Sequence, residues 1–304
     1  MNVLEVRNLK KVIGKREIIK DLNFTVKPGE IYGFLGPNGA GKTTTIRMLV
    51  GLISPTSGEV LICGESLQKN KEKALKDVGA VVENPELYKY LSGRENLMQI
   101  ARIRKVSKDE INKLIKLVGL ENRIDDKVKK YSLGMKQRLG LAAALIGNPK
   151  LLILDEPTNG LDPSGIIDFR NIVKKASRER GMAVLVSSHI LSEVQQLCDR
   201  VAFINDGVIK ATEDMGEAIQ GTSKESLTLV TRNKEDKVIK VLRNQPFVVT
   251  ADGNKDGINV VIHIGMTPEL IKALVKEDIL IEEIYKNREG LEQRYMELVE
   301  GGIR

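Results

Sequence analysis

Short apolar segments alternate with helical repeats over the first two thirds of the chain. Residues 30–35, Leu151–Leu154 and Ala183–Val186 are short and mainly apolar, which is typical of buried strands. Residues 108–120 instead place their apolar side chains three and four positions apart, as an amphipathic helix does. Buried strands separated by helices predict an α/β fold with a parallel sheet covered on both faces.

The pattern changes after about residue 210. Strands are expected over 225–231, 246–250, 258–264 and 279–284, and helices over 234–244 and 267–276. The resulting β-α-β-β-α-β order predicts a small α+β unit with a ferredoxin-like arrangement. The chain is therefore expected to form two domains, residues 1–215 and residues 216–304.

A final helix is expected over residues 288–300, where Leu291, Tyr295 and Leu298 fall on one face. This face either packs on its own domain or serves a dimer or regulatory contact. His263 lies in an alternating strand earlier in this part and is expected to be structural.

The charge differs between the two parts of the chain. The net charge is +7, with +11 over residues 1–210 and −4 over residues 211–304. Such basicity fits a phosphate ligand, a membrane surface, or neither. No basic stripe interleaved with aromatic residues is present, so no nucleic-acid partner is expected.

Composition excludes several classes of protein. Hydrophobic residues make up 41% of the chain, which is enough for a core and excludes a disordered tail. Cys63 and Cys198 are too few for a disulfide scaffold or a four-cysteine zinc site, and two histidines are too few for a histidine-rich metal centre. No stretch approaches the roughly 20 apolar residues of a membrane-spanning helix, and the start lacks a signal-peptide pattern. A soluble, cytoplasmic protein is expected.

A glycine-rich turn follows the first apolar segment and precedes a helical stretch. It matches the phosphate-binding loop, in which backbone N–H groups surround phosphate oxygens and a helix directs its positive end at the same anion. In this pattern Lys42 is expected on the β- and γ-phosphates, and the Thr43 hydroxyl on Mg²⁺. The residues predicted to bind nucleotide here are Gly36, Pro37, Asn38, Gly39, Ala40, Gly41, Lys42, Thr43 and Thr44.

Two carboxylates, Asp155 and Glu156, follow the apolar segment Leu151–Leu154. The first is placed to meet Mg²⁺ through water, and the second to act as general base for a water that attacks the γ-phosphate. Taken alone, the pair fits an exposed strand end equally well.

A further element connects these motifs to one family. Ser132 begins the sequence Ser-Leu-Gly-Met-Lys-Gln-Arg and lies 24 residues before Glu156, while Gly160–Pro163 and His189 follow it. In order and spacing, residues 1 to about 210 closely resemble the ATP-binding-cassette (ABC) ATPase family. The resemblance implies a phosphate-loop cassette with a RecA-like core, a helical subdomain over about residues 85–145 and an antiparallel β subdomain. It also implies ATP hydrolysis, with ATP and Mg²⁺ as cofactors.

The resemblance implies further residue roles. Two cassettes are expected to pair head to tail around two ATP molecules, so that Ser132 and Gly134 contact the γ-phosphate bound by the other copy. Asp162 resembles the acid that communicates across the dimer, and His189 the histidine that touches the γ-phosphate. A lone histidine is more often structural, but His189 follows a strand end, where ligands of α/β sheets collect. The expected catalytic residues are Glu156, His189 and Lys42.

Three places depart from the family pattern. Glu83 stands where the family usually has Gln near Mg²⁺ and the membrane subunit. It is expected either to bind Mg²⁺ or to need a basic partner on the permease, unless it is a tolerated loop substitution. Ile13 falls near the usual position of an aromatic ring that stacks on adenine, which predicts weaker or less adenine-selective binding. Tyr131 and Leu133 replace commoner residues beside the two γ-phosphate contacts.

The implied function is ATP hydrolysis that drives export through separate membrane permease subunits. A glutamate at the position of Glu83 is a feature in which the chain resembles the bacitracin and lantibiotic (bacteriocin-immunity) exporters. The C-terminal part resembles that of antimicrobial-peptide-resistance and sodium- or drug-export ATPase subunits. The chain is thus expected on the inner face of the cell membrane, paired with an identical or paralogous cassette. The alternative is a non-transport ABC ATPase that acts on a soluble or ribosomal assembly. The signature segment of this family, Ser132–Arg138, argues against a kinase or GTPase.

Overall fold

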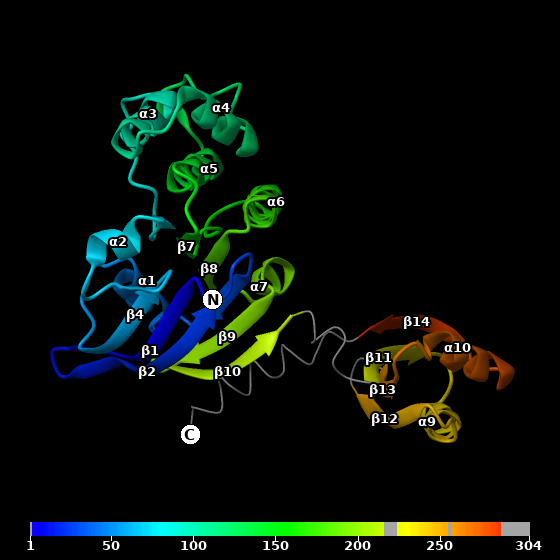
Figure 1. Ribbon diagram of the computed structural model, residues 1–304. Coiled ribbons are helices and arrows are strands. Elements are labelled where there is room, and N and C mark those ends of the chain that lie inside the picture. The colour runs from blue at the N-terminus through cyan, green and yellow to red at the C-terminus, as the bar shows by residue number, and fades with distance from the viewer. Residues whose placement is uncertain (1, 216–223, 255–256, 287–304) are drawn as a thin grey trace. The chain divides into compact units, whose positions relative to one another are not determined.

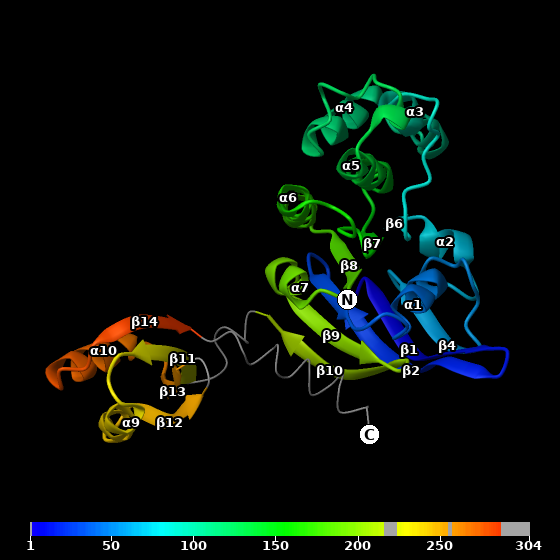
Figure 2. The same cartoon turned by 180° about the vertical axis from the view of Figure 1, so that it is seen from behind.

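The computed structural model describes residues 2–215, 224–254 and 257–286. The chain divides into two compact units, Met1–Met215 and Gly216–Arg304. Figures 1 and 2 show the helices and strands of these units from opposite sides.

A six-stranded sheet forms the centre of the first unit. Its strands are β3 (Ile31–Leu35), β6 (Val78–Val81), β7 (Leu151–Asp155), β8 (Ala183–Ser188), β9 (Arg200–Asn205) and β10 (Val208–Asp214). The order is β10-β9-β3-β8-β7-β6, and all neighbours are parallel except β9 and β10. Every residue of β3, β7 and β8 is buried, which explains why these strands are almost continuously apolar. The predicted parallel strands are confirmed.

One face of this sheet packs against helix α1 (Lys42–Leu49) and a second, antiparallel sheet. The strands of the second sheet are β1 (Leu4–Ile13), β2 (Arg16–Val26), β4 (Ser57–Ile62) and β5 (Glu65–Ser66). Their order is β2-β1-β4-β5. The rings of Phe24, Tyr32 and Phe34 pack together inside the shared core. This core holds α1, and the loop before it, against the parallel sheet.

Helices α6 (Pro163–Arg180) and α7 (Leu191–Leu197) lie against the other face, as Figure 1 shows. Phe169 of α6 and Val194 of α7 line one small pocket together with Val186 of β8. Helix α6 follows β7 after a loop over residues 156–162, α7 follows β8 after two residues, and both turn back over the sheet, as in other α/β proteins.

A group of helices projects beyond the parallel sheet in Figures 1 and 2. The end of one of them, α5 (Leu133–Ala144), packs on β6, where a Cβ atom on Gly79 would lie 2.1 Å from the Ala144 carbonyl oxygen. Ser92, Ser107 and Ser132 each precede one of its helices and accept a hydrogen bond from the backbone N–H three residues on. Each serine thereby satisfies a donor that the helix leaves without a partner. The group contains α3 (Gly93–Arg104), α4 (Lys108–Leu117), η1 (Val128–Lys130) and α5 (Leu133–Ala144), while α2 (Lys71–Leu75) follows β5. The helix predicted over 108–120 is confirmed as α4.

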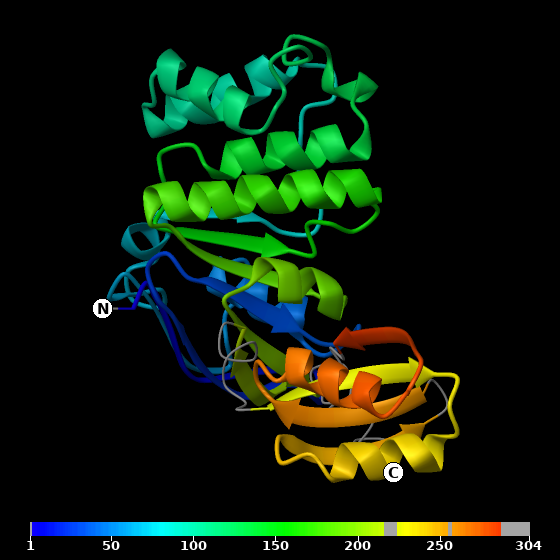
Figure 3. The ribbon, with the colours of Figure 1, turned by 90° about the vertical axis from the view of Figure 1, so that its right-hand side faces the viewer.

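The second unit is a four-stranded antiparallel sheet with two helices. Its elements are β11 (Lys224–Thr231), α9 (Glu235–Arg243), β12 (Val248–Asn254), β13 (Gly257–His263), α10 (Thr267–Lys276) and β14 (Ile281–Lys286). The strand order is β12-β13-β11-β14. Leu242 of α9 and Leu270 of α10 share one core with the strands, and Figure 3 shows both helices beside the sheet in yellow and orange. The predicted order of elements is confirmed.

Among residues 2–215, 224–254 and 257–286, no helix is both long and apolar enough to cross a membrane. The helix predicted over 288–300, with Leu291, Tyr295 and Leu298, lies outside the described residues.

Candidate nucleotide site

Two glycines shape the loop between β3 and α1. Gly41 precedes α1 with a φ of 104°, a left-handed conformation that favours glycine. A Cβ atom on Gly36 would lie 2.1 Å from the carbonyl oxygen of Ile204, so no side chain fits there. The loop therefore leads closely over β9 into the N-terminus of α1, where the helix dipole and its N–H groups favour an anion.

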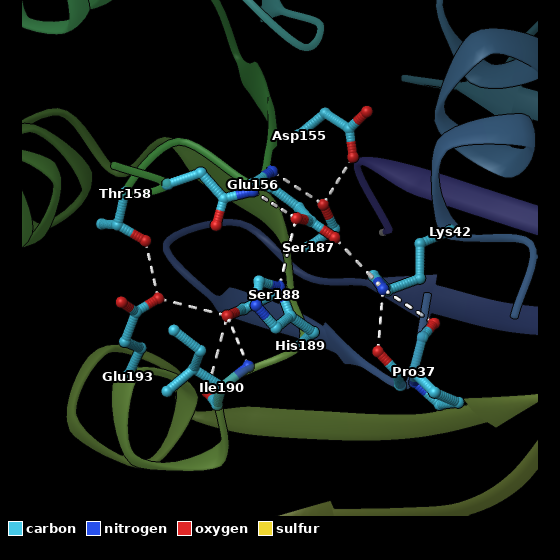
Figure 4. Close-up of polar contacts among 12 residues, drawn as sticks. Pro37, Lys42, Asp155, Glu156, Thr158, Ser187, Ser188, His189, Ile190 and Glu193 are labelled. Atoms are coloured by element: carbon cyan, nitrogen blue, oxygen red, sulfur yellow. Dashed lines mark hydrogen bonds and ion pairs between the residues drawn. The ribbon is translucent and has the colours of Figure 1, made fainter. Parts of the chain in front are cut away.

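Lys42 is buried below this loop, with 4% of its side chain exposed. Its Nζ donates to the carbonyl oxygens of Gly36 at 2.8 Å and Pro37 at 3.1 Å. The same Nζ lies 3.2 Å from Oε1 of Glu156. Figure 4 shows the Lys42 side chain pointing toward this carboxylate. Three oxygen partners satisfy an ammonium that would otherwise be costly to bury.

Asp155 ends β7 and is buried, with 1% of its side chain exposed. The strand register places it opposite Ser187 of β8, whose hydroxyl donates to Oδ1 at 2.6 Å. Burial raises the pKa of Asp155, although the hydroxyls of Ser187 and Thr43 act in the opposite direction. Its other oxygen, Oδ2, has no hydrogen-bond partner among the described residues.

The carboxylate of Asp155 has the properties of a metal ligand. An unpartnered buried acceptor is unfavourable unless something else satisfies it, and a carboxylate oxygen is a ligand that Mg²⁺ prefers. Thr43 and Glu83 both act on the pKa of Asp155, so they lie near it. The described residues contain no group of three His, Cys, Asp or Glu side chains arranged for a metal. Mg²⁺ is usually bound through one or two carboxylates together with water and substrate phosphates, and the oxygen donors of Asp155 and Thr43 are of this kind.

Glu156 has a φ of 45°, and its backbone N–H donates to the Ser187 hydroxyl at 2.9 Å. Its carboxylate meets Lys42, the side-chain amide of Asn159 and, at 3.2 Å, Nδ1 of His189. Burial alone would raise the pKa of Glu156, but these three groups together lower it. The carboxylate is therefore ionised at neutral pH, as a general base has to be.

Two groups at this site are not singled out by the sequence pattern. Ser187 contacts both acids at once, and Asn159 donates to Glu156. The one sequence signal for Ser187 is its position at the end of a buried strand, two residues before His189.

Glu83 follows β6 with a φ of 61°, and its carboxylate pairs with the guanidinium of Arg47 in α1. A basic partner is therefore present in the chain itself. The two side chains are 53% and 44% exposed, and an exposed ion pair contributes only about 0–1 kcal/mol, so it separates readily.

The signature segment lies at the start of α5, apart from the phosphate loop. Ser132 accepts a hydrogen bond from the backbone N–H of Met135 at 3.3 Å. Gly134 faces Leu161, and a Cβ atom added to it would meet that side chain at 3.7 Å, an ordinary contact. Leu133 is 40% exposed and borders Gly160. Within one chain, the described contacts of these residues do not include the phosphate loop.

The other predicted site residues lie on several elements of the first unit. Ile13 ends β1 with 54% of its side chain exposed. Asp162 caps α6, where its carboxylate accepts from the backbone N–H of Gly165 at 2.9 Å. In the phosphate loop, Asn38 and Gly39 are exposed, Ala40 is buried and Thr44 is half-buried.

Tyr131, at the position before Ser132, is buried and donates its hydroxyl to the carbonyl oxygen of Arg123 at 2.7 Å. The departure from the family pattern at Tyr131 therefore serves the packing of the helical group. It leaves Ser132 in its capping position.

The chain is similar to known proteins over most of its length. The family model described as ABC transporter matches residues 19–159. An uncharacterized ABC transporter ATP-binding protein of Bacillus subtilis (strain 168) is 48% identical over 97% of this chain and 95% of its own. The bacitracin transport ATP-binding protein of Bacillus licheniformis is 42% identical over 99% of this chain and 98% of its own.

Solved structures of ATP-binding cassettes share the fold. One of them, a dimeric cassette in a post-hydrolysis state bound to ADP and phosphate, has a TM-score of 0.63 and 25% sequence identity. It covers 70% of this chain and 98% of its own length.

Proposed function

The chain belongs to the ABC transporter family as an ATP-binding, ATP-hydrolysing protein, and from this premise we propose that it powers export through separate membrane permease subunits. The proposed cargo is an antimicrobial peptide or drug, and the proposed location is the inner face of the cell membrane. The observation that carries the proposal is the similarity to a bacitracin transport ATP-binding protein over nearly the full length of both chains.

We assign the hydrolytic roles to the residues gathered at the ends of β3, β7 and β8. Lys42 exchanges its ion pair with Glu156 for the phosphates of ATP. Glu156, thus released, accepts the proton of the attacking water. His189 contacts the γ-phosphate and stabilises the charge that develops on it. Thr43, Asp155 and Glu83 are the residues that would hold Mg²⁺, which when bound neutralises phosphate charge.

Two copies of the cassette are proposed to complete each site. Ser132 and Gly134 of one copy would contact ATP bound at the phosphate loop of the other, with Asp162 near the shared face. The openness of Gly134 within its own chain is compatible with a ligand approaching it closely.

The permease is proposed to dock beside Glu83. A groove lies there, lined by β6 and the residues after it and by parts of α3 and α5, including Pro85, Tyr88 and Ile100. Tyr88 is 68% exposed, the groove is lined by both polar and apolar residues, and exposed aromatic residues are enriched on protein-docking surfaces.

The test is to recover the partner from gently solubilised native membranes with the tagged full-length chain. Recovery of a polytopic membrane protein is expected, and Glu83→Ala should reduce it. Glu179→Ala, which removes an exposed carboxylate on α6, is the matched control and should leave recovery unchanged.

A second measurement tests the cargo. Cells that lack the chain should become sensitive to a bacitracin-type peptide, and the wild-type chain but not Glu156→Gln should restore resistance. Recovery of ribosomes or of soluble proteins alone, with no change in sensitivity, would contradict export and favour a non-transport ATPase.

A further inference from the structure

We propose that Glu193 is a positioning residue for ATP hydrolysis, which fixes His189 relative to Glu156 through one carboxylate oxygen. The inference rests on the roles proposed above for Glu156 and His189. It assigns a function in the reaction to a residue of α7 whose carboxylate is bonded to Thr158 and Ser188.

One oxygen atom of Glu193 connects two segments of the site. Its Oε2 accepts a hydrogen bond from Oγ1 of Thr158 at 2.6 Å and another from Oγ of Ser188 at 3.1 Å. Figure 4 shows the carboxylate between these two hydroxyls. Thr158 and Ser188 are buried, with 9% and 5% exposed, so water does not readily replace either bond.

The two connected segments are those that carry the proposed base and the proposed γ-phosphate contact. Thr158 lies two residues after Glu156, and Ser188 lies directly before His189. The backbone N–H of Ile190, directly after His189, also donates to the Ser188 hydroxyl at 3.0 Å. The backbone on both sides of His189 is thus tied to Ser188, and through Ser188 to Glu193.

The imidazole itself has more freedom than its backbone. Its side chain is 36% exposed, and Nδ1 lies 3.2 Å from Oε2 of Glu156. The position of this ring therefore depends mainly on where residues 188–190 are held. A displacement of about 1 Å in a reacting group costs up to about a hundredfold in rate, so the anchor of this segment matters for hydrolysis.

Because a single oxygen accepts both bonds, the proposed role needs an acceptor and not a negative charge. Gln offers a carbonyl oxygen in the same place, whereas Met has a similar length and no comparable acceptor. Glu193→Met should lower kcat for ATP hydrolysis about tenfold while the Kd for ATP stays within about twofold. Glu193→Gln should recover most of the kcat that Glu193→Met loses. Glu179→Met makes the same change at an exposed carboxylate of α6 and should leave both values unchanged.

The decisive measurement is a double-mutant cycle with His189→Ala, made on the purified full-length chain. If Glu193 acts through His189, Glu193→Met should lower kcat about tenfold in the wild-type background and less than twofold in the His189→Ala background. An equal loss in both backgrounds would overturn the proposal. Failure of Glu193→Gln to recover more activity than Glu193→Met would overturn it too.

A second variant tests the same role if Glu193→Met does not fold. Thr158→Val removes one of the two donors and keeps the shape of the side chain, so it should show the same dependence on His189 with a smaller loss. If His189→Ala or Glu156→Gln alone leaves kcat unchanged, the proposed roles of those residues fail. If both lower kcat and the cycle is additive, only the inference about Glu193 fails.

Discussion

The two glycine-bearing segments assigned to ATP, the loop before α1 and the start of α5, meet their own chain in different ways. At Gly36 the backbone of β9 leaves no room for a Cβ atom, because the Ile204 oxygen would lie 2.1 Å away. At Gly134 the nearest side chain is Leu161, at 3.7 Å. The chain's own packing therefore requires glycine at Gly36 and does not require it at Gly134. A requirement at Gly134 has to come from a molecule outside the chain.

The largest effect on ATP binding is expected at Gly36, where the backbone of β9 leaves no room for a side chain. Gly36→Ala should lower the affinity for ATP by up to about a hundredfold and lower the midpoint of thermal unfolding, because overpacking costs about 1–3 kcal/mol and displaces the loop. Isothermal titration with ATP and a thermal melt measure the two effects. A variant that binds ATP normally would show that the loop moves away from β9 without cost.

Gly134→Ala should separate hydrolysis from folding. Alanine fits the space within one chain and is the better helix former by about 0.5–1 kcal/mol, so the midpoint of thermal unfolding should stay or rise. Hydrolysis at saturating ATP should nevertheless fall about tenfold or more, because the added methyl group lies where the other copy's ATP is proposed to bind. Wild-type hydrolysis by this variant would remove Gly134 from the ATP site.

The control for this comparison is ATP binding to the separated chain. Gly134→Ala should bind ATP with wild-type affinity at protein concentrations too low for pairing, because its phosphate loop is intact. Gly36→Ala should bind ATP more weakly under the same conditions. The two variants should therefore differ in the Kd for ATP.

A smaller effect is expected at the adenine end of the site. Ile13 is 54% exposed at the end of β1 and offers an apolar surface without a ring. Base–aromatic stacking contributes about 1–3 kcal/mol in nucleic-acid complexes, so Ile13→Tyr should raise the affinity for ATP about tenfold and favour ATP over GTP. Titration of both nucleotides checks this, and unchanged affinities would show that Ile13 does not contact the base.

The sequence predicts those parts of the site that are formed by residues close together along the chain. The phosphate loop and the strands before and after it are local patterns, and β3, α1, β7 and β8 lie where these patterns place them. The resemblance to a family then supplies roles for residues such as His189, which the local pattern leaves ambiguous.

Contacts between segments that lie far apart in the sequence cannot be predicted from such local patterns. The bond from Ser187 to Asp155 exists because the register of β7 and β8 places the two residues opposite each other. The bond from Thr158 to Glu193 joins a loop after β7 to a helix after β8. No repeat or spacing in the sequence encodes such a register. The second unit shows the same limit, since its elements are predictable and its strand order β12-β13-β11-β14 comes from pairing across the chain.

The smallest expected effect concerns the buried acid whose pKa is raised. Burial raises the pKa of Asp155 above its value in the unfolded chain, so the folded state binds the proton more tightly. The contribution of this group to stability is therefore greatest at low pH and falls as the pH rises through its unfolded and then its folded pKa. At pH 7, without Mg²⁺ or ATP, Asp155→Asn should raise the midpoint of unfolding by about 2–4 °C, the shift that about 1 kcal/mol gives in a domain of this size.

The gain from Asp155→Asn should shrink as the pH is lowered toward 4, because the wild-type acid then becomes protonated in the folded chain. Asp168→Asn, at an exposed position of α6, should shift the midpoint very little at either pH. Added Mg²⁺ and ATP should stabilise the wild type more than Asp155→Asn, since only the wild type offers the unpartnered carboxylate oxygen as a ligand. A lower midpoint for Asp155→Asn at pH 7 would show that the carboxylate is already satisfied in the folded chain. In that case the second carboxylate oxygen of Asp155 would not be available as a metal ligand.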